Sequence, residues 1–527
     1  MFSPAENLRF KELQGALQSM NWQGSELFDQ DDYDILVVPS LSIDQQELKK
    51  VPGVVHYEER LLFSLIHLRN PRTRVIYVTD QPLSPLITDY YLQLLAGVPF
   101  HHASDRLLLL SAYDSSLQPL TAKILQRPRL IARIKQAIRP DRCYMVCYNS
   151  TELEKQLALA LDIPLLACDP DLYYWGFKSG SKEVFHQAGV PTPAGSDNLS
   201  SVTDLITAIA QLWSEKPHLQ KMVIKLNEGF SGEGNAIFEL SPLAAYAPPY
   251  KNYGATLNAI EQALEQNHIR FQSPGECWST FSQRIPEIGA IVEEFIGGEE
   301  VRSPSFQGYI TPQGEVKILS THDQILGGPD QQIYLGCSFP ADSAYRLQIQ
   351  TLGVRIGQVL AQKKAIERYG VDFMAVKQGE QWVVTAIEIN LRKGGTTHPF
   401  MILKLLTNGN YDEATGLFHG QDHQEKYYFA TDNLHKSSYQ GLLPQDLMDI
   451  LVGHRLHFQA SQQKGSVFHL MGSLSEFGKV GLTSIGNSFT EAQSIYNHVE
   501  AVLDDECRRT GKTAVLPPNL VIPRSRQ

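Results

Sequence analysis

The sequence predicts an α/β protein of several domains, and three observations lead to that class. The chain has 527 residues, more than one ordinary hydrophobic core can hold, so two to four domains are expected. Hydrophobic residues make up 43% and charged residues 20%, which are ordinary values for a globular chain. Short apolar runs also alternate with helical patterns through residues 1–165, as they do around a parallel sheet.

The first part of the chain predicts a layered βαβ domain. Four apolar runs are typical of buried parallel strands: Asp34–Ser40, Arg74–Asp80, Leu107–Ser111 and Cys143–Tyr148. Between them, helical spacing recurs at Leu83–Leu95 and Leu120–Ile138. No GxGxxG motif follows any of these strands, so dinucleotide binding has no support. We assign residues 1–168 to this domain.

The middle of the chain begins with a helix and continues with a glycine-rich hairpin. A helix at Ser179–Ala188 stops at Gly189, and the prolines that follow prevent its continuation. Strands are then predicted at Met222–Leu226 and Ala236–Leu240, with a glycine-rich loop between them. Residues 243–285 are polar and interrupted by proline, so we expect a variable insertion there, with a helix at Thr256–Gln266.

Further elements complete a second and a third domain. Strands are predicted at Ala290–Ile296, Gln307–Ile310 and Val316–Ser320, then a long helix at Leu347–Tyr369 and a hairpin of Asp372–Val376 with Trp382–Asn390. The last segment has strand patterns at Val467–Met471 and Val480–Ser484 and a helix at Thr490–Asp504. We therefore predict domains at 169–410 and 411–527.

Composition excludes several classes of partner. The net charge of −11 argues against nucleic acid, whose phosphates favour a concentrated basic surface. The six cysteines are scattered without a zinc-type arrangement, which is typical of reduced thiols in a cytosolic protein. The N-terminus lacks the pattern of a signal peptide, and no run approaches the roughly 18 apolar residues of a membrane span. We expect a cytoplasmic protein without a membrane partner.

Two lysines and a glycine-rich loop have the chemistry of a phosphate site. Lys178 begins a predicted helix, although a lysine there is more often a solvated surface residue. Lys225 ends a predicted strand, and the loop Gly229–Gly234 follows, with Gly232 at its centre. Glycines let backbone N–H groups converge on phosphate oxygens, and lysine adds a point charge. A plain hairpin turn is an equally good interpretation of the loop alone, and the GK[ST] of a Walker A loop is absent.

An acidic strand end follows, with the sequence VEEFIGGEE at Val292–Glu300. Backbone and carboxylate groups at such a strand end can face an adenine edge, and a later carboxylate can take the ribose hydroxyls. Taken alone, an exposed acidic edge strand is the favoured interpretation.

Three oxygen donors in the predicted hairpin indicate a metal site. They are Asp372, Glu388 and Asn390, and both carboxylates interrupt apolar stretches, where an uncompensated charge is costly. Glu388 and Asn390 lie on the same face of one strand. Mg²⁺ takes oxygen ligands and shares them with nucleotide phosphates, so we favour metal binding over a half-exposed sheet.

A loop rich in hydrogen-bond donors comes directly after this strand. It supplies Arg392, Lys393, Gly394, Gly395, Thr396, Thr397 and His398. Such donors can hold a transferring phosphoryl group, an acyl phosphate or a substrate carboxylate.

Taken together and in this order, the four motifs resemble the ATP-grasp superfamily. The resemblance implies that Lys178 and Lys225 contact ATP phosphates, and that Glu293, Glu294 and Ile296 hold the adenine. It also implies Glu300 for the ribose, and Asp372, Glu388 and Asn390 for one or two Mg²⁺ ions, with Mn²⁺ as a substitute. The motifs span roughly residues 170–400.

A closer resemblance, over nearly the whole chain, is to the ATP-grasp peptide ligases of pheganomycin-type biosynthesis. It rests on DPDLYYWGFKSGSKEVFHQAGVPTPAG, EINLRKGGTTHP and HLMGSLSEFGKVGLTSIGNSFTEA. It implies an ATP-grasp fold with an N-terminal pre-ATP-grasp (Rossmann-like) domain and a small C-terminal domain. Homodimers are common in the families it resembles.

The implied reaction is an ATP-dependent carboxylate–amine ligation through an acyl phosphate, releasing ADP and phosphate. Lys225 and Arg392 would stabilise the transferring group, and the substrates would be a small carboxylate and an amine, either an amino acid or a peptide. Two alternatives stay open: a catalytically silent ATP-binding regulator, and a phosphotransferase with a phosphorylatable histidine. His469 fits a core histidine better, and His322 and Asp323 fit a substrate contact or a surface loop equally well.

Overall fold

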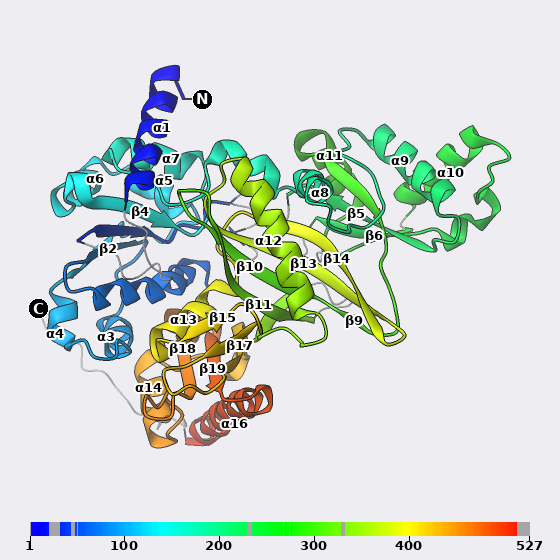
Figure 1. The fold of residues 1–527 in the computed structure, drawn as a ribbon. Coiled ribbons are helices and arrows are strands. Elements are labelled where there is room, and N and C mark those ends of the chain that lie inside the picture. The colour runs from blue at the N-terminus through cyan, green and yellow to red at the C-terminus, as the bar shows by residue number, and fades with distance from the viewer. Residues whose placement is uncertain are drawn as a thin grey trace, which may run out of the picture.

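The protein is described here from a computed structural model. The described residues are 2–20, 32–43, 48–49, 51–228, 234–266, 268–272, 275–327 and 333–513. They form a mixed α/β structure (Figure 1), with the N-terminal sheet on one side, a lobe around β5 and β6 on the other, and the C-terminal strands below. None of the helices among these residues is long and apolar enough to cross a bilayer.

The N-terminal sheet is fully parallel, as predicted. Its strands are β1 (Asp34–Val38), β2 (Arg74–Thr79), β3 (Leu107–Ser111) and β4 (Cys143–Cys147), in the order β3-β2-β1-β4. The expectation that every strand is buried is wrong for β3, where Leu108 is 40% exposed, because β3 is an edge strand. The helix expected at 120–138 is divided, because Pro128 lacks the N–H needed to continue it and begins a new helix instead.

Helices surround this sheet and lead toward the centre of the molecule. They are α1 (Pro4–Ser19), η1 (Val54–Arg69), α3 (Pro85–Gln93), α4 (Phe100–Ser104), α5 (Leu120–Leu125), α6 (Pro128–Ala137), η2 (Pro140–Arg142), α7 (Glu152–Leu161), η3 (Pro170–Gly176) and α8 (Lys178–Gln187). The segment η1 has a nearly continuous buried run from Tyr57 to Ile66. It packs against α13 (Thr397–Thr407), so the N-terminal domain shares one hydrophobic core with the C-terminal half.

A second sheet forms a lobe of its own. Its strands are β5 (Lys221–Leu226), β6 (Asn235–Glu239), β7 (Ile269–Phe271) and β8 (Ala290–Glu294), in the antiparallel order β7-β6-β5-β8. The helices α9 (Val202–Glu215), α10 (Tyr253–Glu265) and α11 (Trp278–Ile288) pack on it in one core, and η4 (Ser241–Tyr246) follows β6. Residues 243–285 therefore pack into the core of this lobe, and the helix predicted at Thr256–Gln266 is confirmed as α10.

The third and largest sheet carries the predicted metal hairpin. Its strands are β9 (Val301–Arg302), β10 (Pro304–Ile310), β11 (Val316–Gly327), β12 (Ile333–Phe339), β13 (Glu367–Gln378), β14 (Gln381–Asn390), β17 (Tyr427–His435), β18 (Gly465–His469) and β19 (Lys479–Gly486). They are ordered β14-β13-β10-β11-β12-β17-β19-β18, and β9 pairs with β13. The predicted hairpin is confirmed, with Asp372 opposite Glu388 and Gly370 opposite Asn390.

One predicted helix extends too far. The helix α12 covers Arg346–Gln362, and the residues up to Tyr369 that were assigned to it belong partly to β13. Lys364 and Glu367 have φ values of 70° and 73°, left-handed conformations that end a helix. Because neither residue is a glycine or proline, the sequence offers no ordinary stop signal there.

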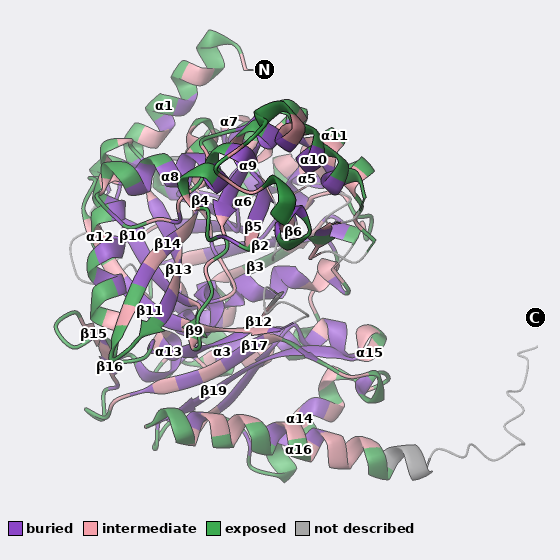
Figure 2. Ribbon diagram, turned by 90° about the vertical axis from the view of Figure 1, so that its right-hand side faces the viewer, coloured by how far each residue is buried: buried purple, intermediate pink, exposed green. Residues whose placement is uncertain are grey.

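The C-terminal strands extend the large sheet directly. Cys337 of β12 is paired with Ala430 of β17, and β19 and β18 follow. Figure 2 shows α16 (Phe489–Thr513) running beneath β17 and β19, with buried and exposed residues alternating along it. The remaining elements are α14 (Pro444–Gly453), α15 (Leu474–Phe477), η5 (Ser437–Tyr439), η6 (Met471–Ser473), β15 (Asn410–Asp412) and β16 (Leu417–His419). The domain boundaries at 168 and 410 stay a prediction.

Candidate active site

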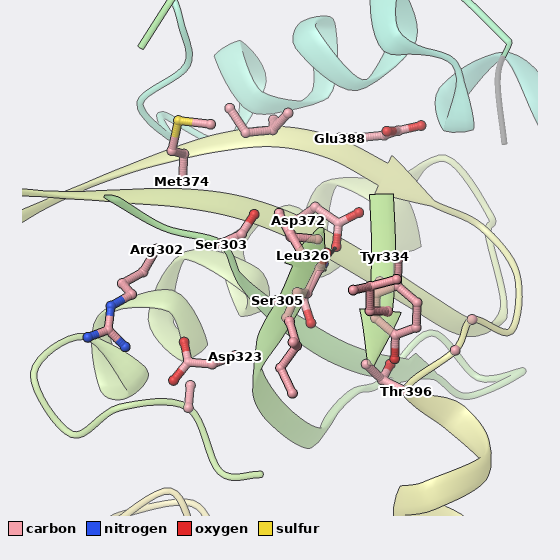
Figure 3. Close-up of a pocket in the computed structure, with 18 of the residues that line it drawn as sticks. Arg302, Ser303, Ser305, Asp323, Leu326, Tyr334, Asp372, Met374, Glu388 and Thr396 are labelled. Carbon is pink, nitrogen blue, oxygen red and sulfur yellow. Dashed lines mark hydrogen bonds between the residues drawn. The ribbon is translucent and has the colours of Figure 1, made fainter. Parts of the chain in front are cut away.

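A cavity of about 1700 Å³ lies between the lobe and the large sheet, and residues of η1 also line it. The lobe contributes Lys225 and the segment 294–298, and the large sheet contributes residues of β10 to β14 and of β17. Figure 3 shows Asp372 and Glu388 on neighbouring strands along one side of this cavity, with Tyr334 and Thr396 close to each other. The cavity thus collects most of the residues predicted from the sequence.

Lys178 lies beside the predicted metal hairpin. It is the first residue of α8 and is 5% exposed, with its Nζ 3.6 Å from Oε1 of Glu388. The backbone N–H of Ile389 donates to Oγ of Ser181 at 3.0 Å, which ties α8 to β14. Lys178 is therefore not the solvated surface residue that a lysine at a helix start usually is.

Lys225 and Glu293 form a buried ion pair. Nζ of Lys225 donates to Oε2 of Glu293 at 2.7 Å, and Nζ of Lys182 lies 3.8 Å from the other carboxylate oxygen. The register of β5 on β8 pairs Val223 with Glu293, which places Lys225 two residues along on the same face. The Glu293 carboxylate is thus engaged by two lysines, and its expected contact with adenine stays a prediction.

The segment 294–298, which begins at the end of β8, lines the cavity next to this ion pair. The Glu294 carboxylate accepts from the backbone N–H of Ala194 at 2.9 Å and from Lys216. Ile296 lines the cavity together with the two glycines that follow it. Glu294 and Ile296 both line the cavity, and their expected contact with adenine stays a prediction.

Glu300 does not line the cavity, and Gly232 cannot be placed relative to it. The Glu300 carboxylate pairs with Arg302 at 2.8 Å and with Lys377 at 3.5 Å, and Glu300 is not among the described residues that line the cavity. The expected ribose contact of Glu300 stays a prediction. Gly232 lies outside the described residues.

The three predicted metal ligands do come together. Nδ2 of Asn390 donates to Oδ2 of Asp372 at 3.1 Å, and Glu388 is the cross-strand neighbour of Asp372. Gln324 of β11, which the sequence did not single out, donates to Oδ1 of Asp372 at 2.6 Å. The Glu388 side chain keeps 27% of its surface exposed, so a carboxylate remains open to the cavity.

The charge state of this pair fits a divalent cation. Burial and the nearby Glu388 charge raise the pKa of Asp372 to about 7, although Arg392 acts in the opposite direction. Two facing carboxylates and an amide oxygen are hard donors that suit Mg²⁺. Within the described residues no three His, Cys, Asp or Glu side chains are grouped for a metal, so phosphate oxygens or water would have to complete the coordination.

The loop after β14 divides into two sets of side chains. Arg392, Gly394, Gly395 and Thr396 line the cavity. In contrast, Nζ of Lys393 donates to Glu367 at 2.9 Å within the protein. Thr397 and His398 are also buried, at 3% and 2% exposure. The expectation that the entire loop supplies donors to a ligand is therefore wrong for these last three residues.

His322 and Asp323 lie in β11 rather than in a surface loop. His322 is fully buried, its Nε2 lies 2.5 Å from the Tyr428 hydroxyl, and burial lowers its pKa to about 3. Asp323 lines the cavity and accepts from the Tyr345 hydroxyl at 2.6 Å. The surface-loop interpretation is wrong for both residues, because β11 continues to Gly327.

Sequence reasoning also missed a charged cluster at the cavity wall. Arg60 of η1, Asp432 of β17 and Lys479 of β19 all line the cavity, although they lie far apart in the chain. The sequence signal for this cluster was a charged residue at an apolar run, as in RLLFSLI at Arg60 and KVGLTSI at Lys479. The sequence does not say that these three residues meet.

Comparison with known families assigns the central part of the chain. Residues 171–414 match a model described as IQCH-like, ATP-grasp, and residues 446–499 match one described as PGM1 C-terminal domain. The first match contains every residue that the sequence singled out for nucleotide or metal binding.

Two curated relatives extend the similarity. The L-propargylglycine–L-glutamate ligase of Streptantibioticus cattleyicolor is 28% identical over 478 residues, which is 89% of this chain and 93% of that protein. The IQ motif-containing protein H of Danio rerio is 24% identical over 413 residues, covering 71% of this chain but only 39% of that longer protein.

Solved structures agree on the fold. A biotin carboxylase–β,γ-ATP complex from Campylobacter jejuni matches with a TM-score of 0.54 at 12% identity, covering 91% of this chain and 95% of that one. The biotin carboxylase domain of the Hydrogenobacter thermophilus 2-oxoglutarate carboxylase, solved with ADP, magnesium ADP and bicarbonate, gives 0.51 at 12% identity, covering the same shares. At this identity the likeness concerns the fold alone. Residues 171–414 are therefore similar to the ATP-grasp family model, and the similarity to the ligase extends over nearly the whole chain.

Proposed function

We propose that this protein is an ATP-dependent carbon–nitrogen ligase that joins a small carboxylic acid to an amine. The observation that carries the proposal is the constellation in one cavity wall: Asp372 faces Glu388, with Lys178 and Arg392 beside them. The full-length relative named as an amino acid–amino acid ligase supports the same reaction class.

ATP would lie between the lobe and the large sheet. The backbone of the hinge at 294–298 would meet the adenine, and Lys178 and Lys225 would contact the phosphates. We assign the Glu293 carboxylate a positioning role, because it already holds the Lys225 ammonium at 2.7 Å. Asp372, Glu388 and Asn390 would hold one or two Mg²⁺ ions, or Mn²⁺ in their place, which neutralise phosphate charge when bound.

The reaction would proceed in two displacements. An oxygen of the substrate carboxylate attacks the γ-phosphorus in line, the bond to the β–γ bridging oxygen breaks, and ADP leaves. The amine nitrogen then attacks the carbonyl carbon of the acyl phosphate. The bond between that carbon and the phosphate oxygen breaks, phosphate leaves, and the nitrogen loses a proton. Lys178, Lys225 and Arg392 stabilise the charge of the transferring group, and no protein nucleophile is required.

Two other functions fit the nucleotide site less well. A catalytically silent ATP-binding regulator has little need of two facing carboxylates, whose proximity is costly without a cation. A phosphotransferase would need an accessible histidine, but His469 is fully buried, with its Nε2 2.7 Å from Oδ1 of Asp432. Neither alternative explains the carboxylate pair and the cavity together.

The test is phosphate release from Mg·ATP across a panel of amino acids and short peptides, with mass spectrometry of the products. Wild type is compared with Glu388→Gln and with Glu380→Gln, a matched change at the exposed turn of the same hairpin. We expect a condensed product from wild type and Glu380→Gln and its loss in Glu388→Gln. Tight ATP binding without product on any panel member would refute the ligase assignment, and equal product formation by all three proteins would refute the role assigned to Glu388.

A further inference from the structure

The guanidinium of Arg60 has one edge without a partner. Arg60 is 4% exposed and lines the cavity. Its Nη1 donates to Oδ2 of Asp432 at 3.2 Å, whereas Nε and Nη2 have no hydrogen-bond partner among the residues that the structure describes. Nε and Nη2 form one side of the planar group, the side that binds a carboxylate with two parallel hydrogen bonds.

Aromatic rings fix the plane of this guanidinium. Its central carbon lies 4.3 Å from the ring centroid of Tyr57 and 4.4 Å from that of Tyr148. These contacts and the Asp432 ion pair hold the group against rotation, so the unpartnered edge keeps one direction. A buried guanidinium with two unsatisfied N–H groups is costly unless a ligand pairs with them.

A second cation contacts the same Tyr57 side chain. Nζ of Lys479 donates to the Tyr57 hydroxyl at 2.8 Å and lies 5.0 Å from the centroid of the ring that also contacts Arg60. Burial lowers the pKa of Lys479 to about 8, Asp432 opposes that change, and Arg60 adds to it. Lys479 is therefore mainly protonated at neutral pH, although it is only 4% exposed.

The charges of this cluster do not balance. Asp432 is the carboxylate in contact with Arg60, and it also accepts from His469. Burial would raise the pKa of Asp432, but the hydrogen bond from His469 and the adjacent positive charges hold it below its usual range. Glu59, the next acidic group along η1, accepts instead from the backbone N–H of Gly472 at 3.0 Å and does not line the cavity. Two cations thus share one carboxylate, which favours an anionic ligand.

The cluster adjoins the loop that follows the metal hairpin. The backbone N–H of Lys393 donates to the carbonyl of Tyr148 at 3.2 Å, and Tyr148 carries the ring that contacts Arg60. The rings of His398 and His469 lie 3.9 Å apart, which joins the same loop to Asp432. A molecule held at Arg60 would therefore lie in the same cavity as Arg392, beside the reacting groups.

We propose that Arg60 and Lys479 bind the free carboxylate of the amine acceptor, so the acceptor is an α-amino acid or a peptide with its C-terminal carboxylate. This inference rests on the ligase function proposed above. The carboxylate of the acceptor survives the reaction and must be kept away from the γ-phosphate, where it would compete with the donor. Its fixed position leaves the amino group of the same molecule to attack the acyl phosphate.

The test compares two acceptors on one acyl phosphate. The first is the amino acid that gives a condensed product in the panel, and the second is hydroxylamine, which has no carboxylate and traps an acyl phosphate as a hydroxamate. The variants are Arg60→Gln, Arg60→Lys and Lys479→Gln, with Arg133→Gln on the exposed face of α6 as the matched control. Arg60→Lys retains the charge beside Asp432 if Arg60→Gln does not fold.

We expect the three site variants to raise the KM for the amino acid roughly tenfold or more, the loss expected for a charged hydrogen-bonding partner. Hydroxamate formation and ADP binding should stay as in wild type. Replacement of the amino acid by its amide should raise the KM of the wild type by a similar factor. The KM of the three site variants should change little. A parallel loss of amide and hydroxamate formation, or an unchanged KM, would overturn the assignment. Weaker ADP binding would assign Arg60 to the nucleotide phosphates and overturn it also. Failure of the wild type to form either product would instead refute the ligase function, and this inference with it.

Discussion

Replacement of Glu293 by glutamine tests how the nucleotide lysines are held in place. The wild-type carboxylate is 2% exposed, accepts from Lys225 at 2.7 Å and lies 3.8 Å from Lys182. The amide leaves Lys225 of the lobe and Lys182 of α8 without this counter-charge. Breaking a buried ion pair by removal of one partner costs about 3–5 kcal/mol, and we expect the lower half of that range because Lys225 retains 10% exposure.

The assay is urea unfolding followed by circular dichroism, for wild type, Glu293→Gln, Lys225→Met and the double variant. The double variant should lose less stability than the sum of the two single variants, with a coupling energy of about 2 kcal/mol. The reason is that neither Lys225 nor Glu293 then leaves an unpaired buried charge on the other. The phosphates of bound Mg·ADP should stabilise Glu293→Gln more than wild type, since they restore the missing negative charge.

Nucleotide selectivity separates a positioning role for Glu293 from adenine recognition. If the carboxylate only holds Lys225, the ratio of ATP to GTP affinity should be the same in Glu293→Gln and in wild type. A fall in that ratio, together with an unchanged urea midpoint, would refute the positioning role and indicate that Glu293 contacts the adenine.

Three further outcomes follow from the same geometry. Chelation of divalent ions should abolish product formation, with recovery on addition of Mg²⁺ or Mn²⁺, and Asp372→Asn should need a higher Mg²⁺ concentration for half-maximal rate. Gly395→Ala should reduce the rate more than tenfold, since the added methyl would lie 2.7 Å from the Tyr334 ring and displace the loop; a rate within twofold of wild type would contradict this. Asp34, fully buried with two arginines, has a pKa held below its usual value despite its burial, so its contribution is present above about pH 4 and is lost as pH falls through its folded pKa. Asp34→Asn should therefore lower stability by about 2–3 kcal/mol at pH 7 in a denaturation series, and the deficit should shrink toward pH 3.

The sequence was most informative where polarity interrupted an apolar pattern. Asp372 and Glu388 stood inside strand-like runs, and the structure places them opposite each other. The parallel N-terminal sheet could likewise be predicted, because buried strands and helical spacing alternate there. In these cases residues close in the chain determine the arrangement.

The direction in which a side chain points was harder to predict from the sequence than its chemistry. Glu300, Lys393 and His398 have suitable donors or acceptors, yet ion pairs and packing turn them away from the cavity. The pairing of Arg60 with Asp432 joins residues 372 positions apart, and no local periodicity encodes such a contact. The end of α12 was missed because it depends on left-handed residues that are not glycine.

The unbroken hydrogen bonding from β14 to β18 has a mechanical consequence. Asp372 and Glu388 at one end and Asp432 and Lys479 at the other belong to a single stiff platform, whereas Lys225 belongs to a separate sheet. We expect a nucleotide to gain access when the small sheet of β5 to β8 tilts relative to that platform. The distance between the metal hairpin and the Asp432–Lys479 cluster would stay constant during such a tilt. This constant distance would limit the length of the substrates that the enzyme can join.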